Sequence, residues 1–198
     1  MINWIKNINK EYPDFWKSYL AKFENKNNRY VAVSSLITGY NPKKDVILSF
    51  GCFGIVENVI RIGDNYEVVI LQYKYLHDNG LSNQFIIESP FLKLSEYQAL
   101  QKFIEYIGNS KLIGYKIENE IEMINSVLTG MDCGKLKNEV LDVEIMHQKL
   151  NDINTVSLNL EELLKFYKIS NNETSSTSDA AYSIALLFLK FKSKLGIK

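Results

Sequence analysis

The chain has 198 residues, 46% of them hydrophobic, which is enough for one well-packed core. Its 23 basic and 23 acidic side chains cancel to a formal net charge of zero, which excludes a protein drawn to nucleic acid by a strong overall positive charge. The two cysteines, Cys52 and Cys133, match no zinc-binding spacing, so we expect two unpaired thiols in a reducing compartment. No apolar run approaches the roughly 20 residues that cross a bilayer, and the charged residues soon after Met1 do not fit a signal peptide. These features predict a cytoplasmic protein without a membrane partner.

Residues 1–28 precede the first predicted strand and are expected to form a helical segment of their own. Apolar and aromatic side chains recur along this segment, and Pro13 interrupts it, which predicts one or two short amphipathic helices. Trp4, Phe15 and Phe23 form an apolar stripe. Two interpretations stay open, because the stripe fits packing on the following domain and also fits contact with a partner or a second copy of the chain.

Residues 29–198 are predicted to form one α/β domain. Three runs rich in Val, Ile, Phe and Tyr predict an antiparallel meander of strands over 29–37, 45–56 and 59–71, with a turn at Glu57-Asn58. Gly51 and Gly54 in the middle run indicate close packing or a bulge.

After an irregular connection over 72–93, helices and strands alternate. Ser95 is expected to cap the first of these helices. This order predicts a mixed sheet covered by helices on both faces. The helices are predicted over 95–107, 118–128, 144–150, 158–167 and 179–194, and the strands over 111–115 and 140–143.

The end of the first predicted strand carries the most informative motif. Residues 34–39 read Ser-Ser-Leu-Ile-Thr-Gly and are followed by Tyr-Asn-Pro. This segment resembles the first motif of the DnaQ-like (DEDD) 3′–5′ exonucleases, Asp-x-Glu-Thr-Thr-Gly followed by Leu-x-Pro. That family includes the proofreading subunit of bacterial DNA polymerase III and ribonuclease T. Ser34 stands at the position of the motif's Asp, and Leu36 stands at the position of its Glu.

Two later segments match the family's second and third motifs in the expected order. Residues 112–120 resemble Leu-Val-Gly/Ala-His-Asn-x-x-Phe-Asp, with Tyr115 for His, Lys116 for Asn and Glu120 for the ligand Asp. The third motif, His-x-x-x-x-Asp-Ala, reads Thr-Ser-Ser-Thr-Ser-Asp-Ala from Thr174, so Asp179 is intact and the base His is replaced. The resemblance implies the ribonuclease H-like fold over about residues 29–195.

The resemblance also implies a chemistry that this chain is poorly equipped to perform. Family members hold two divalent metal ions with four carboxylates, and a His acts as general base. Here Ser34 and Leu36 replace two carboxylates, Glu120 is one methylene longer than Asp, and Thr174 replaces the base. We therefore expect a degenerate exonuclease domain with negligible hydrolysis and no required cofactor.

Several alternatives remain open at the level of sequence. Glu120 and Asp179 are either solvated helix residues or weak ligands of one Mg²⁺ or Mn²⁺ ion, which would support weak exonuclease activity. Thr38, Gly39, Tyr115 and Lys116 are candidate contacts to the 3′ end of single-stranded DNA or RNA, although Thr38-Gly39 is also an ordinary turn signal. Lys116 either neutralises the lost metal site or faces solvent. An interaction module that binds a protein partner or a second copy, without nucleic acid, is the competing function.

The two histidines, His77 and His147, match no catalytic spacing, so a surface or half-buried position is expected for both.

Overall fold

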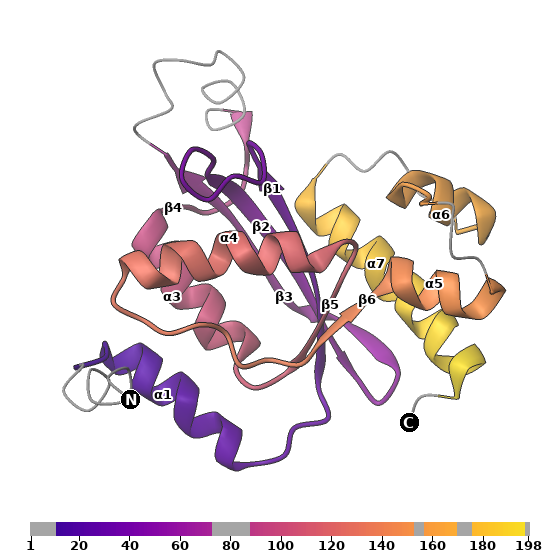
Figure 1. Ribbon diagram of the computed structural model, residues 1–198, viewed down its shortest axis with the longest axis horizontal. Coiled ribbons are helices and arrows are strands. Elements are labelled where there is room, and N and C mark those ends of the chain that lie inside the picture. The colour runs from indigo at the N-terminus through magenta and orange to yellow at the C-terminus, as the bar shows by residue number, and fades with distance from the viewer. Residues whose placement is uncertain (1–10, 73–87, 153–156, 170–175, 197–198) are drawn as a thin grey trace, which may run out of the picture.

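The computed structural model describes residues 11–72, 88–152, 157–169 and 176–196, and these form a six-stranded mixed sheet with helices on both faces (Figure 1). The strand order is β4-β3-β2-β1-β5-β6. The strands are β1 (Tyr30–Ile37), β2 (Ile47–Val56), β3 (Val59–Leu71), β4 (Lys93–Ser95), β5 (Lys111–Gly114) and β6 (Val140–Asp142). The helices are α1 (Asp14–Ala21), the 3₁₀ turn η2 (Lys22–Glu24), α3 (Glu96–Ile107), α4 (Ile117–Gly130), α5 (Val143–Asn151), α6 (Leu160–Phe166) and α7 (Thr177–Leu195).

The predicted meander is confirmed. β1 pairs antiparallel with β2, and β2 pairs antiparallel with β3. Glu57 and Asn58 both have positive φ, at 53° and 61°, as a tight turn that follows the right-handed twist of a hairpin requires. Beyond β1 the parallel strands β5 and β6 complete the α/β, ribonuclease H-like arrangement that the motifs implied.

One strand was not predicted. β4 is three residues long and pairs parallel with the end of β3, next to the helix that it precedes. We expected an irregular connection here, because a three-residue strand with one apolar side chain, Leu94, shows no alternation of polar and apolar residues. The remainder of that connection, residues 73–87, lies outside the described residues, as does His77.

Two hydrophobic cores hold the layers together. On one face of the sheet, side chains of α1, α3 and α4 pack on Val31, Val33 and Phe50, and Phe103 stacks on Phe50 with ring centroids 4.5 Å apart. On the other face, α5, α6 and α7 pack on Tyr30, Ala32 and Ile55. Because successive residues of β1 alternate between these faces, both are covered, as predicted.

Helix α1 packs on this domain rather than away from it. Trp16 and Tyr19 are buried in the first core, while Phe15 and Phe23 pack at its margin. The Tyr19 hydroxyl donates to Asn138 Oδ1 at 2.6 Å and accepts from the Lys137 backbone N–H at 2.8 Å. Burial raises the pKa of Tyr19 to about 12. Trp4, the third member of the predicted stripe, lies outside the described residues. The division of the chain into a helical segment and a domain, between residues 28 and 29, stays a prediction.

The two glycines of β2 serve the two purposes that the sequence suggested. A Cβ on Gly51 would lie 2.2 Å from the Thr177 carbonyl carbon, so the start of α7 rests directly on the strand. Gly54 lies at the register shift between β2 and β3, and a Cβ there would come within 1.8 Å of Asp64 Oδ2. Both positions therefore exclude any side chain.

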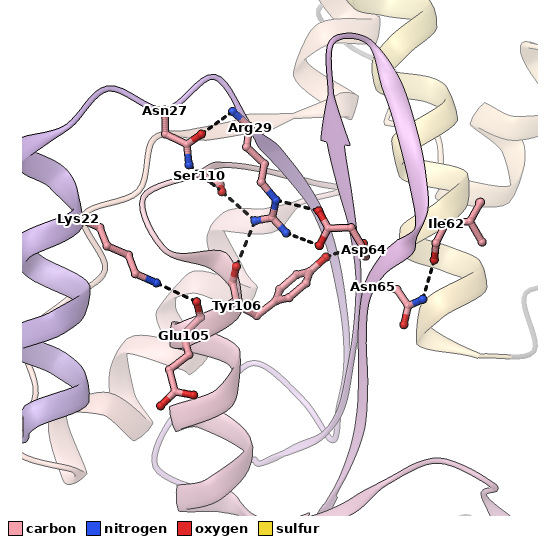
Figure 2. A network of polar contacts seen from close by, with 9 residues as sticks. All are labelled: Lys22, Asn27, Arg29, Ile62, Asp64, Asn65, Glu105, Tyr106 and Ser110. Carbon is pink, nitrogen blue, oxygen red and sulfur yellow. Dashed lines mark hydrogen bonds and ion pairs between the residues drawn. The ribbon is translucent and has the colours of Figure 1, made fainter.

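A polar network surrounds Arg29 at the end of the sheet where β1 begins (Figure 2). The guanidinium donates to Asp64 through Nε at 2.9 Å and Nη2 at 2.8 Å, and Nη1 donates to the Tyr106 carbonyl and to Ser110 Oγ. The Tyr106 hydroxyl donates to the Asp64 carbonyl at 2.8 Å. This network joins β1, β3 and the last turn of α3.

His147 is fully buried, at 1% exposure, so the expected surface or half-buried position is wrong. Its Nδ1 lies 2.8 Å from the Tyr167 hydroxyl, and Asn151 Nδ2 approaches the same nitrogen at 3.1 Å. These partners satisfy the imidazole inside the second core, which sequence spacing on α5 could not show. Burial lowers its pKa, so the neutral ring is favoured. Cys52 and Cys133 are buried free thiols, as expected.

No helix among the described residues combines the length and apolar character that crossing a membrane requires.

Candidate nuclease-like site

The three motifs converge at the end of the sheet where β1 finishes, which we call the motif end. Ser34 and Leu36 lie on the last half of β1, Glu120 lies in the first turn of α4, and Asp179 lies in the first turn of α7. Because β1 is central in the sheet, α4 and α7 approach it from opposite faces (Figure 1). Thr174 lies outside the described residues.

Ser34 and Leu36 point to the face that α7 covers. Ser34 pairs with Gly51 and Leu36 pairs with Ser49, and alternation places both on the side of Ala32 in the second core. Leu36 is 40% exposed, which makes it an apolar side chain at the surface where the family has a carboxylate. Neither position supplies a charged ligand.

Glu120 directs its carboxyl group into the protein, toward Ser35 on the α4 face. The residue is half-buried as a whole, yet its Oε2 is buried and has no hydrogen-bond partner of normal geometry, and neither has Ser35 Oγ. Burial raises the pKa of Glu120 to about 8, a shift that the backbone and side chain of Ser35 partly offset. At neutral pH this side chain is therefore largely a neutral acid, which is a poor metal ligand.

Asp179 belongs to the cap of α7. Ser176 Oγ accepts from the Asp179 backbone N–H at 3.1 Å and donates to Asp179 Oδ2 at 3.1 Å. A carboxylate in this position also faces the positive end of the helix dipole. The Asp of the third motif thus has a structural role that its chemistry alone does not reveal.

Thr38 and Gly39 form the loop that joins β1 to β2. Thr38 Oγ1 donates to Asp45 Oδ1 at 3.2 Å and accepts from the Val46 N–H at 3.0 Å. A Cβ on Gly39 would lie 2.6 Å from Asp45 Oδ2, so glycine lets this carboxylate reach the Asn41 N–H at 2.8 Å. These contacts give Thr38 and Gly39 a structural role in the loop. Contact of the two residues with nucleic acid stays a prediction.

Tyr115 and Lys116 lie between β5 and α4. The Tyr115 hydroxyl donates to the Leu158 carbonyl at 2.8 Å, which ties this turn to the segment before α6. Lys116 has φ 50° and ψ 38°, a left-handed conformation that Asn adopts more easily than Lys. Its ammonium lies 4.0 Å from Glu144 Oε2 and over the Tyr115 ring, and the side chain is 43% exposed. Lys116 therefore pairs with the buried Glu144 while its own side chain remains partly in solvent, which agrees better with the solvent-facing interpretation than with neutralisation of Glu120 or Asp179.

Asp142, at the end of β6, joins two helix starts. Its Oδ1 accepts from the Glu144 N–H at 2.7 Å and its Oδ2 accepts from the Ile117 N–H at 3.1 Å. These two bonds give Asp142 a structural role, since they hold the starts of α4 and α5 at the end of β6.

Sequence reasoning missed two polar residues at the motif end, Ser49 and Glu67. Glu67 pairs with Gly51 across β2 and β3, so it shares the α7 face with Ser34, two strands or about 10 Å away. Its carboxyl group accepts hydrogen bonds from Ser178 and Ser176 at the start of α7, and burial raises its pKa. Alternation along β3 placed Glu67 on one face, but only the register places it opposite Gly51 and beneath α7.

The charged groups of the motif end do not fit a two-metal centre. Such a centre needs several carboxylates around one point. Here Glu120 lies on the α4 face and Glu67 and Asp179 on the α7 face, and the positions between them hold a hydroxyl and an isobutyl group. Within the described ranges no group of three or more His, Cys, Asp or Glu side chains could hold a metal ion. Metal binding by Glu120 and Asp179 remains a prediction.

The chain is similar in sequence to one curated protein and in fold to several solved structures. No protein-family model matches it. It is 27% identical over 177 residues to "DNA polymerase III PolC-type" of Clostridium perfringens, a match that covers 85% of this chain and 12% of that protein.

Solved structures of exonuclease I share the fold. One superposes with a TM-score of 0.67 at 11% identity, over 84% of this chain and 41% of the other. The E. coli enzyme in complex with a dT13 oligonucleotide gives a TM-score of 0.68 at 11% identity, over 86% and 42%. A zinc-bound form of its complex with single-stranded DNA gives 0.67 at 11% identity, again over 86% and 42%. The chain thus spans less than half the length of these proteins. Together these matches show that the chain shares the fold of exonuclease I.

Proposed function

We propose that this chain, which resembles the DnaQ-like 3′–5′ exonuclease family in fold and in sequence, is an exonuclease-like domain that no longer hydrolyses nucleic acid. The proposal rests on two side chains at the motif end, Leu36 and Glu120. A half-exposed Leu36 occupies a ligand position, and the Glu120 carboxyl turns into the protein toward Ser35. Because each change removes negative charge that a two-metal mechanism requires, we infer that hydrolysis by this mechanism has been lost.

We favour binding of a single-stranded 3′ end as the function of this domain. It is supported by exonuclease I, which has been solved with dT13 on the same fold. Thr38, Gly39, Tyr115 and Lys116 are the candidate contacts, and among them Lys116 offers the positive charge that attracts phosphate. Deoxyribose and ribose strands are equally compatible with these residues.

The hydrolysis claim is tested with labelled single-stranded DNA and RNA in the presence of Mg²⁺ or Mn²⁺. We expect no 3′-end trimming by the wild-type protein above that of Asp179→Ala. Trimming that disappears in Asp179→Ala would establish the weakly active, metal-dependent exonuclease instead.

Binding is tested by titrating the protein with a single-stranded oligonucleotide that has an unlabelled 3′ end, at several salt concentrations. Phosphate contacts give an affinity that falls steeply with salt. A steep slope that flattens in Lys116→Ala supports strand binding, and Lys135→Ala, at an exposed lysine outside the three motifs, is the matched control. No binding at low salt would favour the protein-interaction module, for which exonuclease I in complex with an SSB C-terminus is a precedent on this fold.

A further inference from the structure

Glu144, in the first turn of α5, is a buried residue beside Lys116, the positively charged candidate contact to a strand. Glu144 is 8% exposed, and its Oε2 lies 4.0 Å from the Lys116 ammonium. Hydrogen bonding with Tyr115 raises the pKa of Lys116 most, and the negative charge of Glu144 adds to that rise. Among the described residues, Lys116 supplies the one ion pair of Glu144. This pair joins the start of α4 to the start of α5.

The position of Glu144 is fixed by contacts other than this pair. Ser157 Oγ donates to Glu144 Oε1, and the Glu144 N–H donates to Asp142 Oδ1 at 2.7 Å. His147 lies one turn further along α5, but burial lowers its pKa, so the neutral ring offers Glu144 no full positive charge. A buried carboxylate costs free energy unless it is both hydrogen-bonded and paired with a cation. Glu144 therefore depends on Lys116 for its compensating charge.

Lys116 has a fixed backbone and a side chain that can reach another anion. Its φ of 50° and ψ of 38° set the left-handed residue before α4, while its side chain is 43% exposed. Lysine carries a compact charge on a flexible four-carbon stem, so its ammonium can exchange one anionic partner for another. A phosphate at the surface and the carboxylate of Glu144 are thus alternative partners of one cation.

We propose that Glu144 is an internal competitor for Lys116, an anion that the phosphate of a bound strand has to displace. The inference rests on the proposed function, because it takes Lys116 as a phosphate contact. In the free protein the pair reduces the positive charge that a strand meets. In the bound state the departure of Lys116 leaves a buried carboxylate with hydrogen bonds alone. Glu144 therefore makes strand binding weaker than Lys116 by itself would allow.

The test compares the affinity of the full chain for single-stranded dT13, and for its uridine counterpart, at low salt in four proteins. These are the wild type, Glu144→Gln, Lys116→Ala and the double variant. Glu144→Gln should bind the strand about fivefold more tightly, which is the equivalent of about 1 kcal/mol for a partly exposed ion pair. In the Lys116→Ala background the same substitution should change the affinity by less than about twofold, because the cation for which Glu144 competes is absent.

Glu118→Gln is the matched control. It removes the same charge from an exposed residue close to Lys116 in the sequence, and Glu118 forms no ion pair among the described residues. Any gain in affinity from Glu118→Gln reflects general repulsion, so it should be equal with and without Lys116.

Glu144→Asp keeps the inference testable if Glu144→Gln does not fold. The shorter side chain retains the charge but withdraws it from Lys116 by one methylene, so the strand should still bind more tightly than to the wild type although the net charge is unchanged.

Three results would overturn the inference while strand binding itself is observed. An unchanged affinity in Glu144→Gln would show that the pair does not oppose binding. Equal gains from Glu144→Gln with and without Lys116 would reduce its effect to general repulsion. Weaker binding by Glu144→Gln would show that Glu144 positions Lys116 for the phosphate. An absence of strand binding by the wild type and every variant would instead overturn the proposed function, and the inference with it.

Discussion

At the end of the sheet where β1 begins, the charged groups are densely paired, whereas the motif end holds buried polar atoms that have no partner among the described residues. Arg29 is bonded to Asp64, Tyr106 and Ser110, and aromatic rings cover the network. The four buried side-chain atoms without a partner in the described residues all lie at or next to the motif end: Ser35 Oγ, Ser49 Oγ, Glu67 Oε1 and Glu120 Oε2. The polar groups of the described residues are thus satisfied at one end of the sheet, and the unsatisfied ones gather at the end where the three motifs meet.

This contrast indicates which end stabilises the fold and which end does not. Unpaired buried groups are destabilising, so they persist where selection once acted, or still acts, on something other than stability. Changes at the Arg29 end should therefore cost stability, whereas conservative changes at the motif end should be neutral or stabilising.

The largest effect is expected from Arg29→Ala. The substitution leaves Asp64 half-buried without its partner and removes hydrogen bonds to two other groups, which should lower the free energy of unfolding by about 3 kcal/mol. Urea denaturation measures the change. Arg61→Ala, which breaks an exposed contact of 3.9 Å with Glu57, is the matched control and should cost less than about 0.5 kcal/mol. Equal losses of unfolding free energy in the two variants would contradict the view that the Arg29 end of the sheet stabilises the fold.

An effect of similar size concerns Glu120 and pH. Its folded pKa, about 8, lies above the ordinary value of 4.5, so folding takes up a proton between these values and stability falls as pH rises through the window. The limiting slope is about 1.4 kcal/mol per pH unit for one such group. In Glu120→Gln this contribution disappears, so the variant should gain stability relative to wild type as the pH rises from 5 to 8.

Thermal or urea unfolding at pH 5, 6, 7 and 8 checks this expectation. Glu118→Gln, an exposed neighbour in the same turn of α4, serves as the control. A stability difference between wild type and Glu120→Gln that stays constant with pH would show that the carboxyl group is ionised and solvated.

The smallest effect is expected from Lys116→Asn. Asn tolerates the left-handed conformation at this position better than Lys, so the variant should be more stable by about 1 kcal/mol, less the weak contact with Glu144. Lys135→Asn, at an exposed position that is not left-handed, should give no gain. A loss of stability in Lys116→Asn would mean that the contact with Glu144 outweighs the backbone strain.

Much of the fold followed from the sequence because its signals are local. The Val- and Ile-rich runs, the Ser95 cap and the glycines of β2 each specify structure within a few residues, and all are confirmed. The order of the three motifs then supplied the topology. β4 was missed because three residues carry no period, and the burial of His147 was missed because its partner Tyr167 comes from another helix.

The site was less predictable, because its properties depend on register and on opposed faces. The order and spacing of the motifs predicted that Glu120 and Asp179 lie at one end of the sheet. They could not show that the two residues approach the sheet from opposite faces. Glu67 and Ser49 belong to no motif, and only their alignment across β2 and β3 unites them beneath α7.

We propose that the scaffold has been kept while the metal ligands have been lost. It is tested most directly by rebuilding the ligands with Ser34→Asp, Leu36→Glu, Glu120→Asp and Thr174→His together, and measuring 3′-end trimming of a labelled single strand with Mg²⁺ or Mn²⁺. We expect no trimming by the wild-type protein, trimming by the rebuilt protein, and its loss when Asp179→Ala is added. Trimming by the wild-type protein at a rate like that of the rebuilt one, abolished by Asp179→Ala, would show instead that the metal site has been retained.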